Sequence, residues 1–130
     1  MKKLSLVGLL IVASHLFATD TTEAKAKPRV VYGTASFYSN SFHGKKTASG
    51  EIFSQQKFTA ACNVLPLGTW IKVTNLRNGK SVIVRTNDRL HARMTRVVDL
   101  SRAAADKLSY VKSGLTRVKV EVLGKNKPEE

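Results

Sequence analysis

Cysteine, acidic and aromatic residues are all scarce in this chain of 130 residues. The single cysteine, Cys62, excludes an intramolecular disulfide framework and any metal or iron–sulfur centre built from cysteines alone. Aromatic residues make up 7% of the sequence, with one tryptophan, which argues against a repeated array of stacking platforms. Neither a Gly-rich phosphate loop nor a recognisable metal-ligand spacing occurs, so we expect no metal and no cofactor.

Basic residues are abundant by contrast. The chain has 22 Lys and Arg against 9 Asp and Glu, a formal net charge of +13. A charge of this size indicates an anionic partner without identifying it. The length predicts one domain, and the hydrophobic content of 42% is sufficient for a packed core.

Residues 1–26 have the layout of a secretory signal peptide. A basic start precedes an apolar run over residues 4–12, and Ala24 and Ala26 occupy the positions that a signal peptidase prefers. The run is too short to span a membrane well, and no cysteine near its end offers a lipoprotein anchor. We therefore expect cleavage after Ala26, no stable membrane span afterwards, and a periplasmic or secreted protein without nucleic acid as a partner.

The rest of the chain is typical of short strands and one helix. β-rich or alternating segments predict strands at 30–38, 69–75, 81–86, 96–100 and 117–123. Asn78-Gly79 predicts a hairpin turn, and Ser101 is expected to cap a helix that ends at Leu108. Residues 53–62 fit a strand edge followed by one helical turn. About six strands suggest a small barrel or a sandwich, and an OB-type barrel also fits.

Three acids remain candidates for chemistry once those in the tail, on the helix and on a wet strand face are set aside. Glu51 lies in a polar loop, Asp88 comes at the end of a strand, and Asp99 interrupts an apolar run. Each also has a structural explanation. Glu51 fits a solvated loop acid and Asp88 a turn with a salt bridge, while Asp99 fits a partner for the amides at the start of the helix or for a nearby arginine. The small and apolar neighbours of Cys62 favour a buried thiol over a nucleophile.

A set of motifs in one order, covering roughly residues 33–123, resembles the rare lipoprotein A (RlpA) family. The motifs are GTASFY at 33–38, FHGKKTASGE at 42–51, TAAC at 59–62, LPLGT at 65–69, VTNLRNG at 73–79, NDR at 87–89 and VDLSRAA at 98–104. The resemblance implies a mainly β domain at 27–124, a six-stranded double-psi β-barrel with one or two short helices, and a flexible tail at 125–130.

The resemblance also implies a function. It indicates an endolytic lytic transglycosylase that cleaves MurNAc–GlcNAc glycan strands of peptidoglycan, forms 1,6-anhydro-MurNAc and remodels the cell wall, acting as a monomer. Expansin-like proteins carry the same barrel, so a non-catalytic peptidoglycan-binding module is the alternative. The basic charge fits either function, because wall polymers carry carboxylates and phosphates.

The family motifs assign roles residue by residue. Asp88 is expected to be the catalytic acid/base, and Glu51 to support catalysis or bind sugar. The residues expected to line the substrate groove are Tyr38, His43, Thr47, Cys62, Asn87, Arg89 and Asp99. This chain has Cys62 where the family usually has a histidine, and Leu90-His91 where it usually has Gly-Pro. A single carboxylate is sufficient for the expected reaction, because the attacking hydroxyl belongs to the sugar itself.

Overall fold

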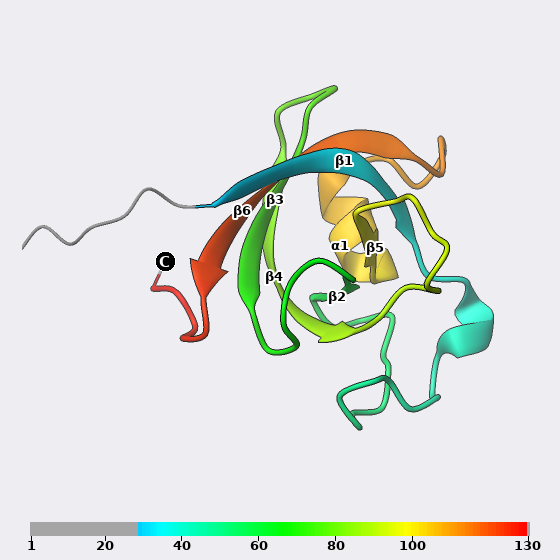
Figure 1. Ribbon diagram of the computed structural model, residues 1–130. Coiled ribbons are helices and arrows are strands. Elements are labelled where there is room, and N and C mark those ends of the chain that lie inside the picture. The colour runs from blue at the N-terminus through cyan, green and yellow to red at the C-terminus, as the bar shows by residue number, and fades with distance from the viewer. Residues whose placement is uncertain (1–28, 130) are drawn as a thin grey trace, which may run out of the picture.

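The computed structural model describes residues 29–129, in which six strands close into a barrel (Figure 1). The elements are β1 (Val30–Phe37), the 3-10 turn η2 (Asn40–Phe42), β2 (Thr59–Ala61), β3 (Trp70–Asn75), β4 (Ser81–Asp88), β5 (Val98–Leu100), α1 (Arg102–Leu108) and β6 (Thr116–Gly124). The strands follow each other around the barrel in the order β1-β5-β2-β4-β3-β6. The expected signal peptide at 1–26 lies outside the described residues.

The barrel mixes parallel and antiparallel neighbours. β1 pairs with β5, and β2 pairs with β4, in parallel, whereas the other four contacts around the barrel are antiparallel. The first strand and the last lie side by side, because residues 30–35 pair with residues 116–121. Because the strands close into a barrel, the β-sandwich that the sequence also allowed is excluded.

Side-chain alternation explains which face of each strand forms the core. On β3 and β4, Ile71, Val73, Val82 and Val84 point inward and are buried, and their neighbours along each strand are more exposed. Residues 76–80, which include the predicted Asn78-Gly79 turn, connect these two strands, and Gly79 has a φ of 79°.

Helix α1 lies beside β1, β4 and β5 (Figure 1). The Ser101 Oγ accepts a hydrogen bond from the Ala104 N–H at 3.3 Å, which confirms the predicted cap. The helix ends where Ser109 adopts the left-handed conformation, with a φ of 59°. Within residues 29–129, no helix has the length and apolar character needed to cross a membrane.

The segment 53–62 differs from the sequence-based expectation. The order is reversed, because a turn at 55–57 comes first and the strand β2 follows it. The reason is the position of β2 between β4 and β5, which the local sequence does not reveal. The turn is fixed from outside, since the Gln55 carbonyl accepts a hydrogen bond from the Ala103 N–H at 2.9 Å.

Candidate active site

A row of four paired residues crosses four strands near one end of the barrel. Asp88 on β4 pairs with Ala61 on β2, Ala61 pairs with Asp99 on β5, and Asp99 pairs with Ser36 on β1. Neighbouring strands lie about 4.8 Å apart, so the backbones of Asp88 and Asp99 are separated by roughly 10 Å. The methyl group of Ala61 leaves space between the two carboxylates.

That space belongs to a cavity of about 470 Å³. Its lining combines the two aspartates with aromatic and basic side chains: Phe37, Tyr38, Ser39, Phe42, Ala61, Asp88, Arg89, Leu90, His91, Met94, Arg96 and Asp99. Four of the residues expected in the substrate groove or as the acid/base therefore meet here, namely Tyr38, Asp88, Arg89 and Asp99. We call this cavity the Asp88 cavity.

The Asp88 carboxylate accepts three hydrogen bonds. The backbone N–H groups of Ala48 and Arg89 donate to Oδ1 at 2.9 and 2.8 Å, and the Tyr38 hydroxyl donates to Oδ2 at 2.6 Å. A backbone N–H can only donate, whereas a hydroxyl can also accept. A proton on this carboxyl group therefore belongs on Oδ2, the oxygen that faces Tyr38.

Tyr38 is held firmly in this position. Its ring stacks on Phe53 with centroids 3.9 Å apart and meets the edge of Phe42 at 5.7 Å. Burial, followed by the hydrogen bond to Asp88, raises the pKa of Tyr38 well above its usual value. The hydroxyl therefore stays protonated at neutral pH and available to Asp88.

Arg89 does not form an ion pair with Asp88. Its guanidinium donates to the carbonyls of Cys62 and Leu65 at 2.5 and 2.6 Å, which fixes the loop that follows β2. Arg89 lines the Asp88 cavity as expected, but its charged hydrogen-bond donors are directed to backbone carbonyls. The Asp88 carboxylate therefore has neutral hydrogen-bond donors and no ion pair with its neighbour Arg89.

Cys62 does not occupy the groove position expected from the motif. Its side chain is fully buried in the barrel core, and it is a free thiol. Only its backbone approaches the site, where its N–H donates to the Asp88 carbonyl at 3.0 Å. Alternation along the chain explains this position, because Ala60 and Cys62 belong to the core while Ala61 between them faces the Asp88 cavity.

Glu51 faces a second hollow, of about 330 Å³, and not the Asp88 cavity. Its carboxylate accepts from the Arg85 guanidinium at 2.5 Å and from the Ser49 hydroxyl at 3.1 Å. The bond from Arg85 is the main cause that lowers the pKa of Glu51 below its usual value. Asp88 and Glu51, the two acids expected to act in catalysis, therefore line different hollows.

A tight turn at residues 47–51 separates the two spaces. Thr47 is buried within it and its hydroxyl lies 3.0 Å from that of Ser49, so Thr47 shapes the turn. Ser49 donates its N–H to the Asn87 carbonyl at 3.1 Å. Asn87 lines the Glu51 hollow, is 3% exposed, and has a side-chain oxygen without a hydrogen-bond partner.

His43 and Asp99 have partners that the sequence did not indicate. The Nδ1 atom of His43 accepts the Gln55 N–H at 3.1 Å, so His43 braces the turn before β2 and lines neither hollow. The Ser36 hydroxyl donates to Asp99. The helix amides that Asp99 was expected to meet are instead bound by Ser101 and Gln55, and that expectation was wrong.

Sequence reasoning missed two residues of the site. The Gln55 side chain donates to the Tyr38 carbonyl at 2.8 Å and accepts the Arg102 N–H at 2.7 Å, so it ties the site to α1. Arg96 lines the Asp88 cavity with its Nε atom buried and unpaired. Gln55 lies in a segment whose secondary structure is ambiguous, so the sequence does not indicate its role in the site. Arg96 was predicted only to begin a strand.

The chemistry available to this arrangement is proton transfer. Asp88 supplies a carboxyl group with one oxygen fixed by backbone donors and the other beside a reversible hydroxyl donor. In the part of the chain that the structure describes, no three His, Cys, Asp or Glu residues are grouped so that they could hold a metal ion.

Comparison with known proteins identifies the family. A family model described as "Lytic transglycolase" matches residues 30–120. The endolytic peptidoglycan transglycosylase RlpA of Pseudomonas aeruginosa is 56% identical over 89 residues, which cover 68% of this chain and 26% of that protein. The protein of the same name from Neisseria meningitidis is 49% identical over 89 residues, covering 68% and 37%. The match thus spans only about a quarter to a third of these relatives.

Solved structures agree on the fold. An expansin of Clavibacter michiganensis has a TM-score of 0.61 at 19% identity, over 78% of this chain and 53% of that one. The six-stranded closed barrel, the family model and the ordered motifs all point to the same relationship. The chain belongs to the RlpA-type lytic transglycolase family and has its double-psi β-barrel fold.

Proposed function

We propose that this protein is an endolytic lytic transglycosylase that acts on the glycan strands of peptidoglycan, with Asp88 as its acid/base. The observation that carries the proposal is the Asp88 carboxylate, with one oxygen fixed by backbone donors and the other beside the Tyr38 hydroxyl, in an open cavity. The names of its 49–56% identical relatives support the reaction class and the substrate.

The first step breaks the bond between C1 of MurNAc and the glycosidic oxygen. Asp88 gives the proton on Oδ2 to that oxygen, which leaves with the bonding electron pair. The Tyr38 hydroxyl then donates to the resulting carboxylate at Oδ2. The backbone donors on Oδ1 keep the carboxyl group from rotating during the transfer.

The second step closes the 1,6-anhydro ring. The Asp88 carboxylate accepts the proton of the C6 hydroxyl as the C6 oxygen forms a bond to C1. Water is not consumed, and Asp88 returns to its protonated state. Because the nucleophile belongs to the same sugar, its effective concentration is high and a second catalytic carboxylate is not required.

Glu51 then has a supporting role. Its ion pair with Arg85 makes it a poor proton donor at neutral pH, so we assign it to substrate binding in the neighbouring hollow together with Asn87. Asp99, Arg89 and Arg96 contact the substrate from the walls of the Asp88 cavity. Thr47 and His43 act as positioning residues through the turns that they brace.

We also propose that the protein works in the periplasm or outside the cell. The support is the signal-like sequence of residues 1–26. N-terminal sequencing of the protein recovered from a periplasmic or culture fraction tests the location. A new terminus at or near Lys27 is expected, and an intact terminus on cytoplasmic protein would refute it.

The test of the activity is digestion of purified sacculi, followed by mass spectrometry for 1,6-anhydro muropeptides. The parent protein should release them and Asp88→Asn should not. Asp106→Asn is the matched control, because Asp106 is an exposed acid on α1 outside both hollows. Equal product from the parent and Asp88→Asn would overturn the assignment of Asp88.

A second function is favoured by one observation. The family usually has a histidine at the position of Cys62, whose thiol is buried here away from the cavity. A protein that binds the wall without cutting it, as in the expansin-like alternative, fits that replacement. It predicts that the parent protein sediments with sacculi and releases no anhydro product, which the same digest measures.

A further inference from the structure

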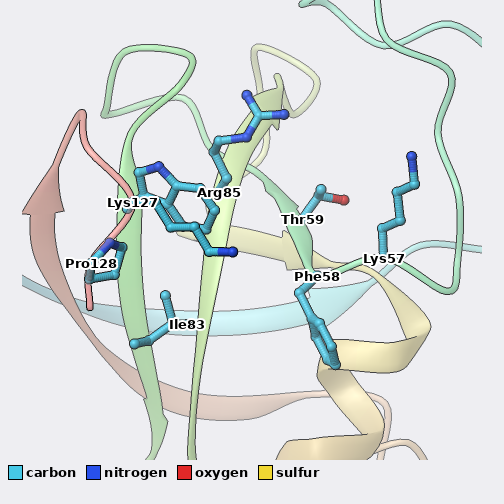
Figure 2. A pocket seen from close by; sticks show the side chains of 8 residues that line it. Lys57, Phe58, Thr59, Ile83, Arg85, Lys127 and Pro128 are labelled. Atoms are coloured by element: carbon cyan, nitrogen blue, oxygen red, sulfur yellow. The ribbon is translucent and has the colours of Figure 1, made fainter. Parts of the chain in front are cut away.

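Three hollows join into one trough on the outside of the barrel, over β2, β4, β3, the end of α1 and residues 127–128. They measure about 330, 310 and 450 Å³. The first two share Lys57, Thr59 and Arg85, and the last two share Phe58 and Ile83. Figure 2 shows the middle one, with Arg85 and Ile83 on one strand and Lys127 and Pro128 beyond. We call the joined surface the basic trough.

The direction of the basic trough follows from the alternation of side chains along β4. Ile83, Arg85 and Asn87 alternate along β4 and point out of the barrel, whereas the residues between them point inward. Arg85 pairs with Thr59 on β2 and with Trp70 on β3, so the three side chains stand in one row. The trough therefore follows β4 up to Asn87, the residue next to Asp88.

The charge of the basic trough is strongly positive. Its cations are Lys57, Lys72, Arg85, Lys107 and Lys127. Two of these cations have an acidic partner. Glu51 is bound to Arg85, and Glu121 is the register partner of Lys72 on β6. An excess of cations on one face attracts a ligand that carries several negative charges.

Apolar surface lies between these cations. Phe58 is 41% exposed, and Trp70 lines the same hollow. The ammonium groups of Lys107 and Lys127 lie 5.9 and 6.0 Å from the ring centres of Phe58 and Trp70. Aromatic faces flanked by ammonium groups fit a ligand with apolar ring faces and charged substituents, which is the chemistry of an anionic glycan.

Asn87 supplies an independent indication of a ligand. Its side-chain oxygen is buried and without a donor at the end of the trough, although buried acceptors in proteins are nearly always paired. A sugar hydroxyl or an amide N–H is the group that this oxygen requires. The position of Asn87 next to Asp88 makes the trough continuous with the edge of the candidate active site.

We propose that the basic trough binds an anionic stretch of the glycan polymer some distance from the bond that is cleaved. This inference rests on the proposed function for the identity of the polymer. Sugar rings contact Phe58 and Trp70, and carboxylate or phosphate groups on the polymer contact the lysines. The trough thereby holds the strand while Asp88 acts on it.

The test compares two variants of equal charge. The triple substitution Lys57→Gln, Lys107→Gln and Lys127→Gln removes exposed cations of the trough. The control, Arg29→Gln, Lys112→Gln and Arg117→Gln, removes three exposed cations outside it. Cosedimentation with sacculi should weaken about tenfold in the trough variant, with a shallower salt dependence, and little in the control. Equal weakening in both variants would overturn the proposal.

Chemical treatment of the sacculi separates the two sources of charge. Carbodiimide amidation neutralises carboxylates, and hydrofluoric acid removes phosphodiester-linked polymers. If the parent no longer binds sacculi more tightly than the trough variant after amidation, the ligand groups are carboxylates. If the difference in binding disappears after acid treatment, the ligand groups are phosphates. An advantage that survives both treatments would refute an anionic ligand.

Product formation is scored separately from binding. If the proposed function holds, the trough variant should need more substrate for half-maximal release of anhydro product and reach the parent's maximal rate. If the parent releases no product, the proposed function fails, and the cosedimentation arms still decide whether the trough binds the wall polymer.

Discussion

Asp88 and Glu51 differ in the kind of partner that each carboxylate has. Asp88 accepts from two backbone N–H groups and from one hydroxyl, all neutral. Glu51 accepts from the charged guanidinium of Arg85. Protonation of Glu51 would break an ion pair, whereas Asp88 has no ion pair to break within residues 29–129. The two acids therefore differ in whether a cation is bound to them.

Tyr38→Phe tests the hydroxyl at Oδ2 of Asp88. The ring stack on Phe53 is kept, and only the 2.6 Å hydrogen bond is lost. A hydrogen bond to a charged group contributes about 1.5–3 kcal/mol, so we expect the rate of anhydro product release to fall roughly 10- to 150-fold. An unchanged rate at saturating sacculi would show that Tyr38 does not assist Asp88.

Glu51→Gln should alter stability in a pH-dependent way. Because Arg85 lowers the pKa of Glu51 in the folded state, the ion pair stabilises the protein above the ordinary value of 4.5. That stabilisation is lost as the pH falls through the lower folded value. The pair is partly exposed, at 32% and 43%, so the difference is about 0.2–1 kcal/mol.

Urea unfolding of the parent and Glu51→Gln at pH 7 and at successively lower pH measures this difference. The two curves should converge at the acid end. A gap that stays constant from neutral to acid pH would mean that the pair contributes nothing through its charge.

At the scale of elements, the turn before β2 connects the site to the helix. Gln55 bonds to Tyr38 and to the first N–H of α1, while Ser101 caps the same helix without contacting the site. These two residues support the same element. Only one of them also fixes the backbone of a residue that touches Asp88.

Gln55→Ala and Ser101→Ala should therefore separate stability from activity. Each removes hydrogen bonds at the start of α1 and should cost about 1–2 kcal/mol in urea unfolding. Only Gln55→Ala should also lower the maximal rate, because it releases the Tyr38 backbone. Equal loss of activity in both variants, measured on fully folded protein, would make the connection purely structural.

The sequence predicted the elements better than it predicted the site. Alternation on β3, β4 and β6 and the cap at Ser101 are local properties, and the structure agrees with them. The site depends on contacts between distant segments: Ala61 on β2 pairs with both Asp88 and Asp99, and Glu51 is bound by Arg85 on β4. The turn before β2 was placed after it for the same reason.

At the scale of the whole molecule, β1 packs closely against Val97, the residue that precedes β5 in the barrel. Gly33 makes this possible, because a Cβ atom there would lie 2.8 Å from the Cβ atom of Val97. That distance is well inside van der Waals contact. A glycine in the middle of β1 is explained by this packing, and its φ plays no part.

Gly33→Ala should accordingly destabilise the fold as a whole. Overpacking of this kind costs about 1–3 kcal/mol, and we expect a lower urea midpoint with an unchanged slope. Tyr32→Ala, at an exposed position of the same strand, is the control and should have a small effect. A Gly33→Ala protein as stable as the control would mean that β1 and β5 can separate without penalty.

The pairing of the first strand with the last has a consequence for the order in which the chain can fold. β6 fills the gap between β1 and β3, so residues 30–35 have no antiparallel partner until residues 116–121 are available. Contacts so distant along the chain make folding slow, in the range of milliseconds to seconds. A chain that emerges with its N-terminus first therefore cannot close the barrel until residues 116–121 have also been released.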